Sequence, residues 1–421
     1  MHSSLAGRPP WAYRLSGFVF ALGCTGLAQA QPMTLDQLLE RAERYNPRLQ
    51  AVVADVGRAR SGITTARAYP NPEVEVLTGG VRARLPGVTS GRGTSLSVGQ
   101  AIDLPLQREP RIRAAEARFE SATLGLEEAR VDLRADVRQA FYGVLQRRAE
   151  LELLQGNQKL LEETRQRIEL SVKVGERARF ELVRVDAELA NARTQAASAR
   201  IRVDQALAQL RLLVGGPGAE TIDTSGELQS AVAYDSLERL HTLVQERHPA
   251  LRRARTELRR AEHVLQSERA LRVPRPTLFA GVDRDPEQSR ALVGVAVPLP
   301  VWDRRQGPVG EAVAGLQQSA ALVEQQRLQL RSALEASWNR LQVATQQIAA
   351  YEGGLIRQAE NALRVAESAF RFGERGFLEV LDAQRVLRQV RSDFLNARFD
   401  RQAALVEIDR LTARDLTGDP R

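Results

Sequence analysis

Cysteine is almost absent from this sequence, and long apolar runs are absent from most of it. The single cysteine, Cys24, lies in a leader-like N-terminal stretch, so the mature chain has neither a disulfide nor thiolate chemistry. After that stretch, no uninterrupted apolar segment approaches the ~20 residues of a transmembrane helix. If the chain spans a membrane, it therefore does so with strands.

Aromatic residues are also scarce, at 5% of the chain, and proline and glycine cluster instead of being scattered. This composition favours long helices over a compact β-sandwich. The hydrophobic share of 43% is sufficient for a buried core, which argues against wholesale disorder.

The motifs of common enzymes are missing. There is no Gly-x-Ser-x-Gly elbow, no glycine-rich phosphate loop and no Cys/His cluster, so we predict neither an enzyme nor a cofactor. His241, His248 and His263 are not spaced as a ligand set, so we predict no resident metal site either.

The charge balance is basic, with a formal net charge of +8. Basic proteins often bind nucleic acid, but here arginines alternate with acids along helical stretches, as in Arg130-Val-Asp132. Such alternation is typical of a solvated, ion-paired helix face, whereas nucleic acid requires a patch of one sign. We therefore expect no nucleic-acid partner.

The N-terminus has the features of a secretory signal peptide. Arg8 and Arg14 precede an apolar run over residues 15–23, and Ala28-Gln-Ala30 offers a small-x-small cleavage site. We predict cleavage after Ala30, which leaves residues 1–30 as signal peptide. Acylation of Cys24 is an alternative, although the leucine before it stands one place later than in the usual lipobox.

The rest of the chain is an internal duplication with a spacing near two hundred residues. Five short segments recur in order: Asn46-Pro47 and His248-Pro249; Pro70-Asn-Pro72 and Pro274-Arg-Pro276; Ala101-Ile-Asp-Leu-Pro105 and Ala296-Val-Pro-Leu-Pro300; Val174-Gly-Glu-Arg177 and Phe372-Gly-Glu-Arg375; Leu189-Ala-Asn-Ala-Arg193 and Leu395-Asn-Ala-Arg398. We predict a first repeat over residues 31–214, a turn-rich linker over 215–236, a second repeat over 237–413 and a tail over 414–421.

Each repeat is predicted to contain a helix, two strands, a long helix, a tight turn and a last helix. Alternation of apolar and polar residues marks the strands. The expected strands are Glu73 to Leu77, Thr94 to Ile102, Thr277 to Val282 and Ala291 to Val297. At their longest they approach the ~9–11 residues of a transmembrane β-strand. Two soluble hairpins are the alternative.

The long helices are the stronger signal. No proline occurs from Arg111 to Lys173 or from Val309 to Arg371, which allows two helices of roughly 90 Å. Apolar residues recur every seven positions: Phe119, Leu126, Leu133 and Ala140; Val137, Val144 and Leu151; Val323 and Leu330; Leu334, Leu341 and Ile348. Two seams on one helix indicate neighbours on both sides, as in a curved wall of coiled-coil helices.

The fold class is therefore mainly α with a small β part. Four strands cannot close a barrel, and lipid does not tolerate an open sheet edge, so several chains would have to pool their strands under cyclic symmetry. The same symmetry would close the helices into a tube. A secreted chain of this design makes a conduit across a membrane and a periplasm.

The sequence resembles the TolC-type outer-membrane efflux proteins over about residues 33–413. The matching features are Asn46-Pro47, Tyr69-Pro-Asn-Pro72, Asp103-Leu-Pro105, Val174-Gly-Glu176, Phe372-Gly-Glu374, Leu378-Glu-Val-Leu-Asp-Ala-Gln384 and Leu395-Asn-Ala-Arg-Phe399. The resemblance implies a homotrimer with a β-barrel in outer-membrane lipid and an α-barrel in the periplasm. Chain length and the Arg/Glu-rich first repeat resemble the heavy-metal cation branch.

The resemblance also implies the partners, a periplasmic adaptor and an inner-membrane pump of the resistance-nodulation-division type. The chain would be their passive outlet, for small solutes or metal cations, with selectivity for metal ions mainly in the pump. The adaptor would contact the two helix tips: Val174, Gly175 and Glu176, and Phe372, Gly373 and Glu374. A glycine with positive φ also suits a helix end that reverses the chain.

Three residues match the aperture of the family. Glu379 and Asp382 match its carboxylates, and Arg375 matches an arginine that holds the closed state. In a trimer each acid becomes a ring that favours cations, whereas a lone acid is ordinarily part of a solvated face. The first tip has extra residues before Leu182 in our alignment, which leaves the register of Glu181 and Asp186 open.

Two other functions remain open from the sequence. A periplasmic adaptor or coiled-coil scaffold also has long hairpins, but only one of them, whereas this chain has a tandem pair with strands in each half. A type I secretion outlet belongs to the same family and differs only in its partner.

Overall fold

The computed structural model describes residues 32–414, apart from residues 83, 85, 88, 229–233 and 235. The predicted signal peptide (residues 1–30), Cys24 and the tail beyond residue 414 lie outside the described residues.

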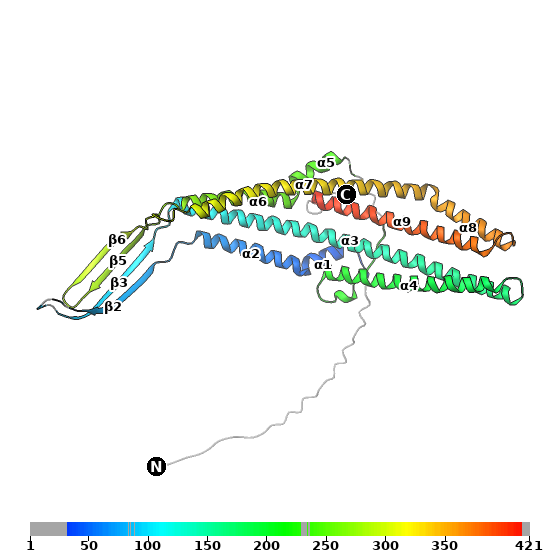
Figure 1. Ribbon diagram of the computed structural model, residues 1–421, viewed down its shortest axis with the longest axis horizontal. Coiled ribbons are helices and arrows are strands. Elements are labelled where there is room, and N and C mark those ends of the chain that lie inside the picture. The colour runs from blue at the N-terminus through cyan, green and yellow to red at the C-terminus, as the bar shows by residue number, and fades with distance from the viewer. Residues whose placement is uncertain are drawn as a thin grey trace, which may run out of the picture.

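The molecule is long and narrow, with a sheet at one end and two helical hairpins at the other (Figure 1). The first half consists of α1 (Leu35–Tyr45), α2 (Pro47–Arg67), β2 (Glu73–Val81), β3 (Gly91–Ala101), α3 (Pro105–Lys173) and α4 (Arg179–Val214). The second half consists of α5 (Leu237–Arg247), α6 (Pro249–Ala270), β5 (Thr277–Arg284), β6 (Ser289–Ala296), α7 (Gln306–Ala350), the π-turn η2 (Tyr351–Leu355), α8 (Ile356–Arg371) and α9 (Phe377–Thr412). The two halves therefore repeat one order of elements.

The segment between the halves is not a bare linker. It contains the short 3-10 turn η1 (Ala219–Thr221) and β4 (Asp223–Thr224). β4 pairs in parallel with β1 (Pro32–Met33), which fastens the beginning of the described chain to this segment.

Among the helices of the described chain, none is both long enough and apolar enough to cross a bilayer.

The four main strands form one antiparallel sheet in the order β2-β3-β5-β6. All four predicted strands are present, and each is longer than predicted. β2 continues to Val81 and β5 to Arg284, while β3 already begins at Gly91 and β6 at Ser289. Within the described chain, the outer edges of β2 and β6 have no partner strand.

The register of the sheet separates its two faces. Val76 lies beside Leu96, Leu96 beside Val282, and Val282 beside Ala291, so an apolar row runs across all four strands. The opposite face is richer in small and polar residues, because side chains alternate along each strand. The alternation predicted for the strands is therefore confirmed.

The longest helix, α3, has 69 residues and is the centre of the helical part. It packs against α2, α4, α6 and α9. Leu133, Val137 and Val144 of the predicted seams lie in its main buried cluster. The expectation of neighbours on both sides of a seam-bearing helix is confirmed.

The second long helix is interrupted, so the prediction of a continuous helix from Val309 to Arg371 is wrong. α7 ends at Ala350, and within the π-turn Gly354 has a φ of 157°. The reason is the adjacent pair Gly353-Gly354, because each glycine costs a helix roughly 0.5–1 kcal/mol and paired small residues are common kink sites. Single glycines in α3 do not interrupt it.

α3 also begins earlier than predicted, at Pro105, and includes Pro110. Proline is well suited to the first helical position because its fixed φ is already helical and its missing N–H has no partner there. The prediction took the helix to begin only after the last proline, and it therefore placed the start too late.

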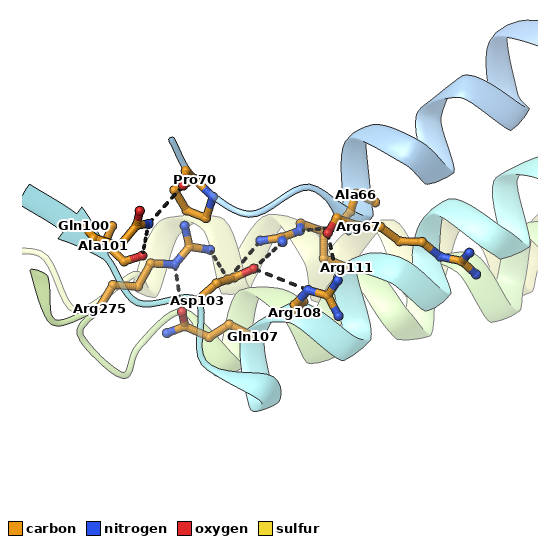
Figure 2. A network of polar contacts seen from close by, with 10 residues as sticks. All are labelled: Ala66, Arg67, Pro70, Gln100, Ala101, Asp103, Gln107, Arg108, Arg111 and Arg275. Carbon is orange, nitrogen blue, oxygen red and sulfur yellow. Dashed lines mark hydrogen bonds and ion pairs between the residues drawn. The ribbon is translucent and has the colours of Figure 1, made fainter. Parts of the chain in front are cut away.

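A buried carboxylate joins the sheet to the helices (Figure 2). The side chain of Asp103, which follows β3, is 0% exposed and accepts hydrogen bonds from Arg111 at 2.6 and 3.3 Å. Arg108 and Arg275 each bring a guanidinium nitrogen within 3.9 Å of it. Since Arg275 belongs to the second half, the carboxylate links the two halves at the base of the sheet.

Hydrogen bonds to backbone carbonyls extend this network (Figure 2). Arg111 donates to the carbonyl of Ala66 at 3.0 Å, and Arg108 donates to that of Arg67 at 2.8 Å, which holds the end of α2. Gln107 donates to the carbonyls of Ala270 and Val273 and accepts from Arg275 at 2.8 Å, which holds the end of α6.

The two short helix pairs differ at one cap. Asn46 caps α2 through its side-chain oxygen, which accepts from the backbone N–H groups of Arg48 and Leu49. At the matching position His248 caps α6, and its Nδ1 accepts from the N–H of Ala250 at 3.1 Å. Only an unprotonated Nδ1 can accept this bond.

Burial, helped by the nearby Arg410 and opposed by Asp132 and Glu407, lowers the pKa of His248 to about 4. The residue is only 3% exposed. The folded state therefore favours the neutral imidazole.

Replacing His248 with asparagine should make the protein less sensitive to acid. An unfolded histidine takes up a proton near pH 6.5, whereas this one resists protonation down to about pH 4. Between these two values, each pH unit of acidification should lower the unfolding free energy of the wild type by about 1.4 kcal/mol. His248→Asn, with a cap like Asn46, should not show this loss. Denaturant unfolding of both proteins across this pH range checks the prediction. If the unfolding free energies of the two proteins changed in parallel with pH, the prediction would be contradicted.

Asp103→Asn should destabilise the protein. It leaves three partly buried arginines without their carboxylate, and we expect a loss of about 2–3 kcal/mol, below the ~3–5 kcal/mol of fully buried pairs. Asp55→Asn is the control, because its ion pair with Arg58 is exposed and should be worth under about 1 kcal/mol. Thermal unfolding checks both, and equal losses would rule out a special role for Asp103.

Candidate functional site: the helix tips

Both helical hairpins end in the same kind of turn. At the first tip, the N–H of Gly175 donates to Val172 and that of Glu176 donates to Ser171, at 3.1 and 2.9 Å. At the second tip, Gly373 donates to Phe370 and Glu374 donates to Ala369, at 3.2 and 2.9 Å. This pair of bonds defines a Schellman C-cap.

The glycines are required by the backbone. Gly175 has a φ of 80° and Gly373 a φ of 74°, in the left-handed region that side chains disfavour. Both helices are therefore terminated and the chain is reversed by the same local device, as the sequence predicted for these two residues.

The two tips are in register, so the extra residues that we assigned to the first tip do not exist. An offset of 198 residues relates Gly175 to Gly373 and also relates the first residue of α4, Arg179, to that of α9, Phe377. With this offset Glu181 corresponds to Glu379, and Asp186 corresponds to Gln384.

The same offset corrects the last of the five repeated segments. Arg193 pairs with Glu162 at 3.0 Å, and Arg391 pairs with Glu360 at 2.8 Å, so these are the equivalent pairs. Asn-Ala-Arg398, which we matched to Asn-Ala-Arg193, therefore lies one heptad further along its helix. Seven residues return a helical motif to almost the same face, which is why the match was misleading.

The three aperture candidates lie at the beginning of α9 and just before it. Arg375 pairs with Glu379 at 3.0 Å, one helical turn away, and both are exposed. Asp382, also exposed, lies 3.5 Å from Arg385, which in turn pairs with Glu188 of α4. Arg385 thus joins the two hairpins across the tip region.

Arg177 is a tip residue that sequence reasoning did not single out. Its guanidinium lies 3.7 Å from the centre of the Phe370 ring and donates to the Phe370 carbonyl at 3.4 Å. It also pairs with Glu181 at 3.1 Å. Its side chain is 23% exposed, against 64% for its equivalent Arg375. The shared Gly-Glu-Arg motif was visible in the sequence, but this difference in burial was not.

An apolar cluster behind the tips joins the hairpins. Its buried members come from three helices: Leu161, Ile168, Val185, Leu189, Ala192, Phe377, Val380 and Leu381. The rings of Phe370 and Phe377 lie 5.4 Å apart. In contrast, Val174, Phe180 and Phe372 at the tips are exposed. Within one chain the hairpins are thus packed together, while the tips present apolar side chains outward.

The tip helices also carry ion pairs, and those of Glu169 lower the pKa of its carboxyl group. Lys173 and Arg165 contact Glu169 and lower the pKa of its carboxyl group, mainly through the hydrogen bond from Lys173. Asp186 pairs with Arg165 at 2.6 Å. The carboxylate of Glu169 is therefore held ionised by these two cations.

A groove of about 570 Å³ lies between α3 and the α8–α9 hairpin, above the apolar cluster. Asn157 and Gln384 line it, and Asn157 Nδ2 and Gln384 Oε1 have no hydrogen-bond partner among the described residues. The groove is otherwise largely apolar, with Leu153, Leu160 and Leu387 among its lining side chains.

In the part of the chain that the structure describes, no group of three or more His, Cys, Asp or Glu side chains is arranged to hold a metal ion. Nothing in the tip region therefore serves as a donor set for a resident metal.

The sequence is similar to two metal-resistance proteins. It is 30% identical over 387 residues to the cobalt-zinc-cadmium resistance protein CzcC of Cupriavidus metallidurans, covering 91% of each chain. It is 25% identical over 317 residues to the nickel-cobalt-cadmium resistance protein NccC of Alcaligenes xylosoxydans xylosoxydans, covering 75% of this chain and 71% of that one.

The fold is similar to that of solved outer-membrane channels. The outer-membrane channel OprN superposes with a TM-score of 0.77 at 19% identity, covering 90% of this chain and 89% of that one. At this identity the likeness concerns the fold alone.

The family model described as "Outer membrane efflux protein" matches residues 38–216 and 240–414. Proteins of this family are located in the outer membrane with a large periplasmic part, and they work with periplasmic adaptors and inner-membrane pumps. The alternative of an adaptor or scaffold is therefore excluded. The chain belongs to the outer membrane efflux protein family, and it is the outer-membrane channel of a tripartite efflux system.

Proposed function

We propose that this channel exports divalent transition-metal cations for a pump of the resistance-nodulation-division type. The observation that carries the proposal is the similarity to the cobalt-zinc-cadmium resistance protein, which extends over nearly the whole of both chains. The channel itself would be a passive outlet, because its described residues offer no metal donor set. Selectivity for the ion would then reside mainly in the pump.

The channel is proposed to be a homotrimer. The described residues of one chain supply a sheet with two open edges, at β2 and β6, and lipid cannot satisfy the hydrogen bonds of an open edge. Joining β6 of one copy to β2 of the next removes every edge, and three copies give a barrel of twelve strands. The apolar row through Val76, Leu96 and Val282 would face the lipid.

Each protomer is proposed to consist of two tandem repeats, residues 31–214 and 237–413, joined by residues 215–236. The order of elements supports this division, because it is the same in both halves. The family model also matches in two separate segments.

The beginning of α9 is proposed to line the inner aperture. Glu379 and Asp382 are exposed acids one turn apart at the tip end of the molecule, and three copies would place six of them around the axis. Such rings concentrate cations. Arg375, paired with Glu379, would hold this region closed at rest, and Arg177 would tie the second hairpin to the first.

The helix tips are proposed to bind the adaptor. Val174, Gly175 and Glu176 of the first tip and Phe372, Gly373 and Glu374 of the second expose apolar surface beside charged groups. The groove above them, lined by Asn157 and Gln384, would receive a helical hairpin of the adaptor. The two unpartnered amide atoms would then find polar side chains of that hairpin.

Deleting this channel from its bacterium should increase sensitivity to zinc, cobalt and cadmium ions by a few fold, because pumped ions would lose their outlet. Resistance to an organic cation such as ethidium should not change. Inhibitory concentrations check this, with the wild-type chain supplied from a plasmid as the control. Sensitisation to ethidium alone would contradict the metal cargo.

Neutralising the aperture acids should reduce cation preference. For Glu379→Gln together with Asp382→Asn we expect the K⁺/Cl⁻ permeability ratio in planar bilayers to fall roughly two- to fivefold, the equivalent of ~0.5–1 kcal/mol. Asp393→Asn is the matched control, since this partly exposed acid lies two heptads beyond Glu379 on the same face of α9. If the control lowered the permeability ratio as much as the double variant, the aperture would not lie at the beginning of α9.

A further inference from the structure

The segment after β6 continues the apolar face of the sheet beyond the last strand. Val293 and Val295 lie on the apolar face of β6, and alternate residues Val297, Leu299 and Val301 extend the series past the strand. All five side chains are exposed. The apolar stripe therefore runs from the sheet into the junction with the helices.

The same segment ends in a tryptophan that the described residues leave almost uncovered. Trp302 is 93% exposed. Tryptophan is enriched where a membrane meets water, because its ring is apolar and its N–H requires a polar partner. Trp302 lies between the end of β6 at Ala296 and the start of α7 at Gln306, and this junction of sheet and helices is where we expect such a boundary.

The segment is held in a defined shape. Pro298 and Pro300 stiffen the backbone, and the N–H of Arg305 donates to Asp303 Oδ1 at 2.7 Å. Arg305 has a φ of 59°, unusual for a side chain of its size, and its guanidinium pairs with Glu268 of α6. The exposed side chains are thus presented by a fixed loop.

A groove of about 570 Å³ lies between this loop and residues 271–275. Four arginines line it (Arg272, Arg275, Arg304 and Arg305) and only one acid, Asp303. Arg275 and Arg305 are held by Asp103 and Glu268. Neither Arg272 nor Arg304 has an ion-pair partner among the residues that the structure describes. The groove thus combines an apolar wall with uncompensated positive charge.

We propose that this groove binds an anionic phospholipid of the periplasmic leaflet. Arg272 and Arg304 would hold the phosphodiester, an acyl chain would follow Val297, Leu299 and Val301, and Trp302 would lie at the level of the headgroups. The charge and the continuity with the lipid-facing stripe favour lipid over a second copy of the chain. The inference depends on the proposed orientation of the sheet in the membrane.

Depth-dependent quenching of Trp302 tests its position. The experiment uses protein from which cleavage after Ala30 has removed the signal peptide and with it Trp11, so that Trp338→Phe leaves Trp302 as the single tryptophan. In phosphatidylglycerol vesicles the Trp302 emission should be blue-shifted. Bromine atoms near the headgroup end of the acyl chains should quench it more than bromine near the chain end. Trp302→Phe is the matched control, because the remaining Trp338 packs with the helical core and should not be quenched.

Lipid retention tests the two arginines. Arg272→Gln with Arg304→Gln should weaken phosphatidylglycerol binding to the detergent-purified protein roughly tenfold in native mass spectrometry, while phosphatidylcholine binding should not change. Arg60→Gln with Arg200→Gln removes the same charge from α2 and α4 and should have no such effect. If both double variants lost phosphatidylglycerol binding equally, net charge alone would explain the effect, and the headgroup site would be overturned.

The failures of the two proposals can be told apart. If the protein inserts and conducts but bromine at no depth quenches Trp302, the lipid site is wrong, whether water or a neighbouring copy covers the ring. If it neither inserts nor conducts, the proposed orientation in the membrane falls, and the lipid site falls with it.

Discussion

The packing seam along α3 is the constraint on which the rest of the protomer depends. This helix contacts α4 of its own half and α6 and α9 of the other, so both halves are assembled on one surface. Its buried residues recur over most of its length, which keeps partners on two sides in a fixed rotation. Without packing on both sides of α3, the Asp103 network at one end and the apolar cluster at the other would not be held in fixed positions relative to each other.

The duplicated motifs do not have duplicated environments. Arg177 and Arg375 occupy equivalent positions, yet one is half-buried against Phe370 while the other is exposed. Asn46 and His248 cap equivalent helices, but only the histidine ties its cap to protonation. Duplication thus produced a symmetric scaffold in which equivalent residues have acquired different surroundings.

Much of the architecture could be predicted from the sequence because its signals are periodic. Alternation around Leu96 and Val98 identified a strand, and the spacing of Leu133, Val137 and Val144 identified a helix with two packing sides. Features that depend on small local energy differences, or on contacts between distant residues, were missed. The Gly353-Gly354 turn and the start at Pro105 result from small differences in backbone free energy, and the burial of Arg177 depends on residues nearly two hundred positions away.

The π-turn at Tyr351–Leu355 makes the two hairpins of one protomer mechanically unequal. α3 is an unbroken rod over its whole length, whereas its counterpart consists of two shorter rods joined at a soft point. A helix resists bending through its continuous ladder of hydrogen bonds, and a break in that ladder lowers its bending stiffness. A load applied at the tips is therefore transmitted by the first hairpin and absorbed as flexure by the second.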